Sequence, residues 1–345
     1  MVFSLSSSLP KLVESQFLSA KASSALLFSP TSLTVIRTSQ NIPFQLRYCP
    51  ALSKKPTAAR KEDTGAKQKP DPFDNPPSDL LIAQIPENNS SHVLVLNKFP
   101  VIAGHFILAT KAYEPQTHAL EQDDLEATYA CLKAWQEDGE ARVASEQRKL
   151  FAFFNSGEHS GASQPHRHLQ FLPVESMKGE DGQGWELLVD LILAGSVPLT
   201  KDPILELLHH PSLPFQHFAV RLPPSPSASD LYGIYTTLYT HAKNAVDTFH
   251  ALHPDPSLYS SPNPDSLPIS YNLAMTTDAM VIVPRRREGR ILKAADATEV
   301  GFVALNGTVL GGTLMVKKEE EWDLLRERPE LLDGILEGIG IPMDK

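Results

Sequence analysis

The stretch Asn155-Ser-Gly-Glu-His-Ser-Gly-Ala-Ser-Gln-Pro-His-Arg-His-Leu-Gln-Phe-Leu-Pro173 carries the clearest signal for the fold of this chain. A loop of small residues leads into the pattern His-x-His-x-Gln, in which apolar and polar residues alternate. Because successive side chains of a β-strand point to opposite faces, His166, His168 and Gln170 are predicted to share one face of a strand. Two imidazoles and an amide beside such a loop form a layout suited to binding phosphate.

The remaining sequence combines many short strand patterns with few helices. Strands are predicted over residues 92–96, 105–110, 151–154, 164–173, 215–222, 269–276, 279–284 and 311–316. Helices are predicted over residues 125–150, 184–194 and 230–252, and a closing acidic helix begins at 318. Consecutive strands with few helices between them favour the α+β class, with a mostly antiparallel sheet flanked by helices.

Composition narrows the class of partner. The 345 residues are 41% hydrophobic, enough for one large domain or two medium ones with a packed core. The formal net charge is −10 and no stripe of Lys or Arg stands out, so nucleic acid is not expected as a partner. No apolar run reaches the roughly 18 residues of a membrane span, so no membrane partner is expected. Cys49 and Cys131 lack metal or redox spacing, which fits a reducing compartment.

Residues 1–61 allow two interpretations. They are basic and Ser-rich, with Glu14 as the only acid, which is the composition of a transit peptide. The alternative is an ordinary folded start, because residues 9–28 have helical apolar spacing and residues 33–36 and 44–48 resemble strands. Composition and periodicity leave both interpretations open.

The two histidines indicate nucleophilic chemistry. A neutral imidazole is a competent nucleophile near pH 7, and its attack on an α-phosphorus would form a phosphoramidate. Backbone N–H groups of the loop 157–164 can bind the equatorial oxygens of that phosphorus. The side chains of Ser160, Ser163 and Gln164 add further donors.

Two simpler interpretations stand beside this one. A His-x-His pair can merely line a half-buried strand. Two histidines on one strand face can also bind zinc, although His159 is the only candidate third ligand nearby and no cysteine pair is present. The Gly, Ser and Asn residues in front of the pair favour the phosphate hypothesis over both.

The same residues resemble a known family. His166-Arg-His-Leu-Gln170 is similar to the His-x-His-x-Gln signature of the transferase branch of the histidine-triad (HIT-like) superfamily. Further motifs resemble the diadenosine tetraphosphate phosphorylases, also called ATP adenylyltransferases. They are Asp71-Pro-Phe-Asp-Asn-Pro76, Asn97-Lys-Phe-Pro100, Gly104-His105, Asn155, Ser160-Gly-Ala-Ser-Gln164, Ser270-Tyr-Asn272, Val283-Pro-Arg285 and Leu314-Met-Val-Lys317. The resemblance extends from about residue 44 to the end.

The resemblance implies a HIT-like fold and a reaction. Diadenosine tetraphosphate (Ap4A) and inorganic phosphate would give ATP and ADP, reversibly, through an enzyme-bound AMP. His168 would be the nucleophile, His166 would orient it through its main-chain carbonyl, and Gln170 would hold the phosphate. Hydrolases of the superfamily have a third histidine in the place of Gln170. Because a neutral amide cannot serve as a general acid or base for water, Gln170 favours transfer to phosphate.

The resemblance also implies a set of substrate-binding residues. They would frame the adenine, bind the phosphate and ribose, or face the polyphosphate. They are Lys55, Phe73, Asn75, Asn97, Asn155, Gly157, Ser160, Gly161, Ser163, Gln164 and Asn272. No metal site and no covalent cofactor is implied, and Mg²⁺ can accompany the nucleotide. The implied partners are small molecules, namely Ap4A, ATP, ADP and phosphate, and the protein is expected to be a monomer or a homodimer.

One segment departs from the family pattern. Thr276-Thr-Asp-Ala279 stands where the family tends to place basic and aromatic residues, which weakens the expectation of a second nucleotide contact there. Three arginines follow, at 285–287, and at least two of them are expected to be solvated.

Three regions are predicted along the chain. An N-terminal extension with a helix and some disorder would cover residues 1–43, a HIT-like catalytic region 44–200, and a C-terminal ATP-adenylyltransferase region that completes the site 201–345. A cleaved peptide would have to end before about residue 40, which favours a cytoplasmic protein, with the nucleus and, less favoured, the mitochondrion as alternatives. The functional alternatives are a dinucleoside polyphosphate hydrolase, another nucleotidyltransferase of the superfamily, and a non-catalytic nucleotide-binding protein.

Overall fold

The computed structural model describes residues 7–51, 70–87, 89–137, 148–179, 182–199, 205–259 and 265–343. Lys55, which the sequence assigns to the substrate-binding set, lies outside these residues. The other predicted site residues lie within them.

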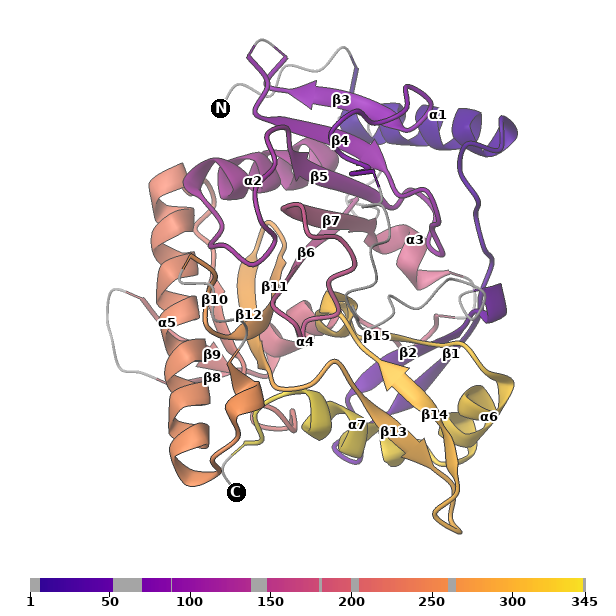
Figure 1. The fold of residues 1–345 in the computed structure, drawn as a ribbon, viewed down its shortest axis with the longest axis vertical. Coiled ribbons are helices and arrows are strands. Elements are labelled where there is room, and N and C mark those ends of the chain that lie inside the picture. Colours follow the sequence, from indigo (N-terminus) through magenta and orange to yellow (C-terminus); the bar gives the residue numbers. More distant parts are fainter. Residues whose placement is uncertain are drawn as a thin grey trace.

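One large sheet organises the described structure, and all of its neighbouring strands run antiparallel (Figure 1). In spatial order its strands are β3 (Leu81–Ile85), β4 (His92–Leu96), β5 (Phe106–Thr110), β7 (His168–Pro173), β6 (Leu150–Ser156), β11 (Ser270–Met275), β12 (Ala279–Arg285), β10 (Phe218–Arg221), β9 (Leu208–His209) and β8 (Val197–Pro198). The histidine-bearing β7 lies between β5 and β6, inside the sheet. The predicted α+β class with a mostly antiparallel sheet is confirmed.

Three helices pack against one face of this sheet, namely α1 (Leu9–Ala22), α2 (Gln122–Gln136) and α5 (Ala228–Leu252) (Figure 1). Their apolar residues share one core with Leu169 and Phe171 of β7. His168 and Gln170 therefore belong to the opposite face of β7, as the period of two along a strand requires. None of the helices among the described residues is long and apolar enough to cross a membrane.

A second core fills the other face. It joins Phe153 of β6 and Leu172 of β7 to α4 (Leu188–Ala194), α7 (Leu331–Ile339) and a small sheet. That sheet contains β1 (Ser32–Arg37), β2 (Pro43–Tyr48) and β15 (Thr313–Val316), and β2 and β15 are parallel. The remaining elements are α3 (Val174–Lys178), α6 (Glu319–Glu327), the hairpin β13 (Gly289–Lys293) and β14 (Glu299–Ala304), and the 3₁₀ turns η3 (Pro256–Leu258) and η4 (Gly307–Gly311).

Segments from both ends of the chain contribute to the same layers. Val13 and Phe17 of α1 are buried in the core under the large sheet. Leu46 of β2 pairs with Leu314 of β15, and Asn155 of β6 pairs with Asn272 of β11. The last pairing matters for the site, because it places a residue from the second half of the chain beside the loop that precedes the histidines.

Two predicted helices differ from the observed ones. The helix predicted over 125–150 ends at Gln136, and Leu150 already begins β6. All of β6 is buried between β7 and β11, so an apolar run without polar alternation forms a central strand. The closing helix divides into α6 and α7 on either side of Pro329, because proline lacks the N–H that a continuous helix needs.

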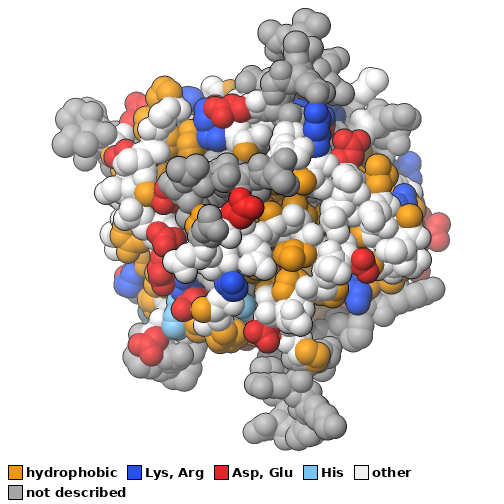
Figure 2. Space-filling view, turned by 90° about the horizontal axis from the view of Figure 1, so that it is seen from above, with side chains coloured by type: hydrophobic (Ala, Val, Ile, Leu, Met, Phe, Trp, Pro, Cys, Tyr) orange, Lys and Arg blue, Asp and Glu red, His pale blue; other side chains and the backbone are white. Residues whose placement is uncertain are grey.

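The surface of the described residues carries both charge signs. Seen from above, acidic and basic side chains are interspersed and no continuous basic patch is visible on the described part of this face (Figure 2).

Candidate active site

His168 begins β7 and is almost completely buried, with 2% of its surface exposed. Its Nδ1–H donates to the main-chain oxygen of His166 over 2.8 Å. This bond assigns the ring proton to Nδ1, so Nε2 keeps its lone pair. Burial, the largest cause, lowers the pKa of His168 to about 4, and the neighbouring His166 lowers it further while the hydrogen bond opposes the shift. The imidazole is therefore neutral at pH 7.

His166 is fixed from both sides of its ring. Nδ1 lies 2.6 Å from a carboxylate oxygen of Asp71, and Nε2 lies 2.9 Å from the Thr110 hydroxyl and 3.1 Å from the Ala112 carbonyl. These partners come from the segment before β3 and from the end of β5. A ring held at both nitrogens also fixes the main chain that carries it, and hence the carbonyl that His168 contacts.

Gln116 fills the gap where β6 and β7 separate. Its amide oxygen accepts from the N–H of His168 over 2.7 Å. Its amide nitrogen donates to the carbonyls of Asn155 and His168 over 2.8 and 3.2 Å. The side chain is 3% exposed and replaces ladder hydrogen bonds at the point where the nucleophile strand parts from its neighbour.

The loop 157–164 is built on two glycines with positive φ. Gly157 has φ +88° and packs against Ser270. Gly161 has φ +77°, and a Cβ there would lie 2.8 Å from the Cβ of Asn306. The buried Ser160 hydroxyl donates to the Gly157 carbonyl over 2.7 Å, so its proton is used within the loop. Only glycine adopts this backbone at low cost, which explains why the loop is rich in it.

Asn272 connects the C-terminal half of the chain to this loop. Its Nδ2 donates to Asn155 Oδ1 and to the Ser160 carbonyl, both over 2.9 Å. Its Oδ1 accepts from the guanidinium of Arg285. Asn155 Oδ1 also accepts from the Gly307 N–H over 2.8 Å, whereas the buried Asn155 Nδ2 finds no partner among the described residues. An unpaired buried donor beside the loop is available to a ligand.

Arg285 is a buried cation whose contacts among the described residues are amide and main-chain oxygens. It is 0% exposed, and its guanidinium donates to Asn272 and to the main-chain oxygens of Arg287, Glu288 and Leu305. Burial lowers the pKa of Arg285 to about 9. Arg286 is half-buried over the ring of Phe249, and Arg287 is exposed.

The structure brings most of the remaining predicted residues to the same region. The Phe73 ring is buried with its centre 5.2 Å from that of His168 and 5.5 Å from that of His166. Gln170, two residues after His168, is half-buried and its Oε1 lies 3.1 Å from His105 Nε2. Asn97 also contacts His105. Asn75 and Ser163 are exposed, and Gln164 is half-buried.

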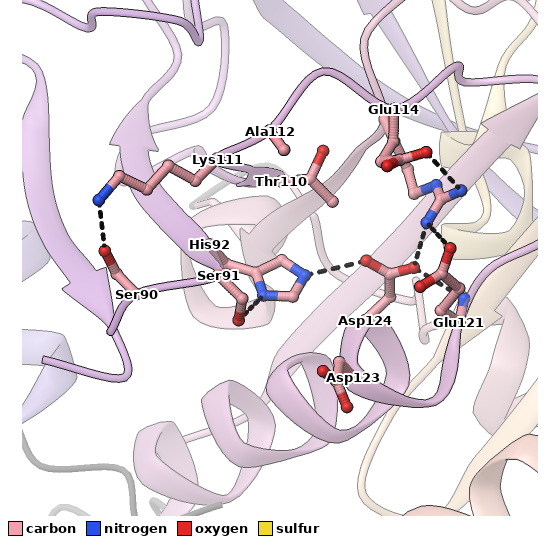
Figure 3. A pocket seen from close by; sticks show the side chains of 11 residues that line it. Ser90, Ser91, His92, Thr110, Lys111, Ala112, Glu114, Glu121, Asp123 and Asp124 are labelled. Carbon is pink, nitrogen blue, oxygen red and sulfur yellow. Dashed lines mark hydrogen bonds and ion pairs between the residues drawn. The ribbon is translucent and has the colours of Figure 1, made fainter. Parts of the chain in front are cut away.

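A pocket of about 470 Å³ adjoins His166, but none of the predicted site residues lines it (Figure 3). Thr110 and Ala112, which contact His166, form part of its wall. Its charged groups are largely paired with one another: Arg167 lies 3.1 Å from Asp124, and His92 Nε2 lies 2.9 Å from the same carboxylate. This network connects Asp124 of α2 to His92 at the start of β4 and to Arg167 just before β7.

Several residues of the site were not assigned by sequence. Asp71 and His105 stood in motifs of the family resemblance without a role of their own, and Gln116 lies in a segment without a recognisable motif. The sequence around Gln116 does not reveal its role, because its partners Asn155 and His168 lie 39 and 52 residues further along the chain. Among the described residues, no three metal-ligating side chains of the His, Cys, Asp and Glu types come together.

The antiparallel sheet and the histidine-centred site fit a HIT-like fold, and the family models identify the chain as a nucleotidyltransferase. Residues 3–188 match the model of the Ap4A phosphorylase N-terminal domain, and residues 211–342 match that of the ATP adenylyltransferase C-terminal domain. The chain belongs to the Ap4A phosphorylase (ATP adenylyltransferase) family, as the motifs predicted.

Full-length relatives agree. The chain is 27% identical over 335 residues to diadenosine 5′,5‴-P1,P4-tetraphosphate phosphorylase 2 of Saccharomyces cerevisiae, covering 97% of this chain and 95% of the relative. It is 28% identical over 344 residues to Protein APA1 of the same yeast, covering 98% and 96%. The crystal structure of yeast Ap4A phosphorylase Apa2 superimposes with a TM-score of 0.77 at 24% identity, covering 99% of this chain and 100% of that chain. The HIT-like fold is thus confirmed.

Proposed function

We propose that the protein catalyses the phosphorolysis of Ap4A, in which Ap4A and inorganic phosphate give ATP and ADP reversibly. The observation that carries the proposal is the buried neutral His168, whose Nδ1–H is tied to the His166 carbonyl. The family and a yeast relative named as a diadenosine tetraphosphate phosphorylase supply the substrate class.

In the first step His168 Nε2 attacks an α-phosphorus of Ap4A. The N–P bond forms as the bond from that phosphorus to the bridging oxygen breaks, and ATP leaves with the electron pair of that bond. AMP remains on His168 as a phosphoramidate. The proton on Nδ1 stays in its hydrogen bond to His166 O, which stabilises the positive charge that develops on the ring.

In the second step an oxygen of inorganic phosphate attacks the same phosphorus. The N–P bond breaks, its electron pair returns to Nε2, and ADP is released. Phosphate is already an anionic nucleophile and needs no general base, whereas water does. The amide of Gln170, two residues after His168 on the same strand face, suits the binding of phosphate oxygens.

The loop and its supports would hold the equatorial oxygens. Glycines with positive φ, as at 157 and 161, are typical of backbone nests that bind anions. The unpaired Nδ2 of Asn155 offers one further donor. The positive charge of Arg285, which is hydrogen-bonded to Asn272, would favour a bound anion at the loop. We expect Mg²⁺, where it takes part, to travel with the polyphosphate.

Product analysis with and without phosphate tests this function. The protein is incubated with Ap4A, and the nucleotides are separated. We expect ATP and ADP in equal amounts when phosphate is present, and almost no turnover when it is absent. Steady formation of AMP and ATP without phosphate would identify a hydrolase instead.

A further inference from the structure

The candidate phosphate ligand Gln170 is hydrogen-bonded to a histidine that has a second partner behind it. Asn97 and His105 face each other across the turn between β4 and β5, where the Asn97 N–H donates to the His105 carbonyl over 3.0 Å. β5 pairs with β7, and Ile107 lies opposite Gln170. The three side chains Asn97, His105 and Gln170 thus form a line from the turn to the site.

The orientation of the Asn97 amide follows from its contacts. Its Oδ1 accepts from the Phe99 N–H over 2.9 Å, so the amide nitrogen is the atom directed at the His105 ring. That nitrogen lies 3.1 Å from Nδ1 and 3.5 Å from Nε2 of His105, so it lies against the face of the ring and helps to hold the ring in place. The position of the ring proton follows from Gln170: its Oε1 lies 3.1 Å from His105 Nε2, and an amide oxygen only accepts, so His105 carries its proton on Nε2.

The hydrogen bond from His105 Nε2–H to Gln170 Oε1 fixes which end of the Gln170 amide faces the ligand. With its oxygen engaged, the Gln170 amide presents its NH₂ group elsewhere, with two donors. The unprotonated oxygens of phosphate accept hydrogen bonds, so an amide turned the other way would set its oxygen against them.

We propose that His105, oriented by Asn97, is a positioning residue that fixes the amide of Gln170 with its NH₂ group directed at the attacking phosphate. This rests on the proposed role of Gln170 in the second step of the reaction. The Phe99 N–H holds the Asn97 amide, the Asn97 amide lies against the His105 ring, and His105 Nε2–H donates to Gln170 Oε1. The first step, the attack of His168 on Ap4A, does not involve these contacts directly.

The test separates the two steps of the reaction. Protein is loaded with AMP by incubation with Ap4A in the absence of phosphate, freed of nucleotides, and mixed with inorganic phosphate while ADP formation is followed. The variants are His105→Phe, Gln170→Ala and the double variant. His105→Phe keeps a ring beside Phe153, whose centre lies 6.5 Å from that of His105. His241→Phe, a ring beside Phe218, serves as the matched histidine control.

We expect His105→Phe to slow AMP transfer to phosphate by about tenfold or more, since one misdirected donor at a reacting phosphorus costs that order of rate. Loading should change by less than about threefold, and His241→Phe should change neither step. In the Gln170→Ala background, His105→Phe should have almost no further effect, because it acts through Gln170. Multiplying losses in the double variant, or an equal loss in both steps, would overturn the proposal.

A second measurement tests the proposal even if His105→Phe folds poorly. Nitrogen-15 NMR of histidine-labelled wild-type protein reports the tautomer of His105 directly. We expect an Nε2–H ring, held by its bond to Gln170 Oε1. An Nδ1–H ring in the wild type would overturn the proposal that His105 positions the Gln170 amide. If AMP-loaded wild type forms no ADP with phosphate, the proposed function is wrong. The NMR result for His105 then still shows which way the Gln170 amide is oriented.

Discussion

The Nδ1 atom of His168 lies 2.8 Å from the main-chain oxygen of His166. One residue thus sets the tautomer of the other without using its own side chain for the task. The His166 ring is free to bind Asp71 and the end of β5, which hold the carbonyl in place. Burial then keeps the His168 ring neutral, and the two effects together produce a nucleophile that needs no deprotonation step.

The pH dependence of AMP loading should reflect this environment. With the pKa of His168 lowered to about 4, the ring is neutral at pH 5.5, so loading from Ap4A should keep most of its pH 7.5 rate. An ordinary histidine would lose about nine-tenths of it. Single-turnover loading without phosphate measures this step alone, and all phosphates of Ap4A stay ionised in this range. A loading rate that halves near pH 6.5 would contradict the neutral buried ring.

Gln116 should be important for both stability and rate. Gln116→Ala leaves the N–H and carbonyl of His168 and the carbonyl of Asn155 without their partner. We expect a loss of about 2–4 kcal/mol in the free energy of unfolding, measured by urea titration, together with slower AMP loading. Gln216→Ala is the control, because that side chain makes one long bond of 3.3 Å to Pro342 O and should cost under about 1 kcal/mol. Equal losses in the two variants would contradict the role of Gln116.

The glycine at 161 should not tolerate a side chain. Gly161→Ala places a Cβ 2.9 Å from the Leu305 carbonyl at φ +77°, so the loop must shift. We expect a cost of about 2 kcal/mol or more in unfolding free energy and weaker binding of AMP by calorimetry. Gly233→Ala on α5 meets nothing within 4 Å and should stabilise the protein by about 0.5–1 kcal/mol. Unchanged AMP affinity in Gly161→Ala would remove the loop from the binding site.

Acid should destabilise the fold through buried neutral histidines. Burial lowers the pKa of His217 to about 4, whereas the unfolded chain has the ordinary value of 6.5. Between these values the unfolded state binds more protons, so stability is complete above pH 6.5 and falls towards pH 4, by up to about 3 kcal/mol for this group. His217→Phe should be less stable at pH 7, because His217 bonds the His210 N–H and the Phe215 carbonyl.

Urea titrations of His217→Phe across this pH range give the check. The variant should lose less stability than the wild type between pH 6.5 and pH 4. Parallel pH curves for the two proteins would show that His217 does not contribute.

The sequence predicted the parts of the fold that depend on local periodicity. Leu169 and Phe171 enter the core while His168 and Gln170 share the other face, because a strand repeats every two residues. The strand predicted over 151–154 is confirmed as part of β6, but the end of α2 was wrong: Leu150, predicted as the last helical residue, is the first residue of β6. A single apolar residue fits either pattern, so periodicity does not show which element it joins.

The supporting residues of the site could not be predicted in the same way. The sequence assigns no role to His105, because only the pairing of β5 with β7 sets it beside Gln170. Arg285 reads as part of a charge cluster until β12 is placed inside the sheet, where its guanidinium meets main-chain carbonyls. These roles depend on contacts between distant segments, and only the folded chain brings the partners together.

Trapping AMP on the protein tests the central claim most directly. The protein is incubated with Ap4A without phosphate, its intact mass is measured, and the modified peptide is sequenced by mass spectrometry. We predict one adenylyl group on His168, absent from His168→Ala, that phosphate releases as ADP. Turnover of Ap4A by a protein that remains unmodified, or an adenylyl group on another residue, would contradict the account.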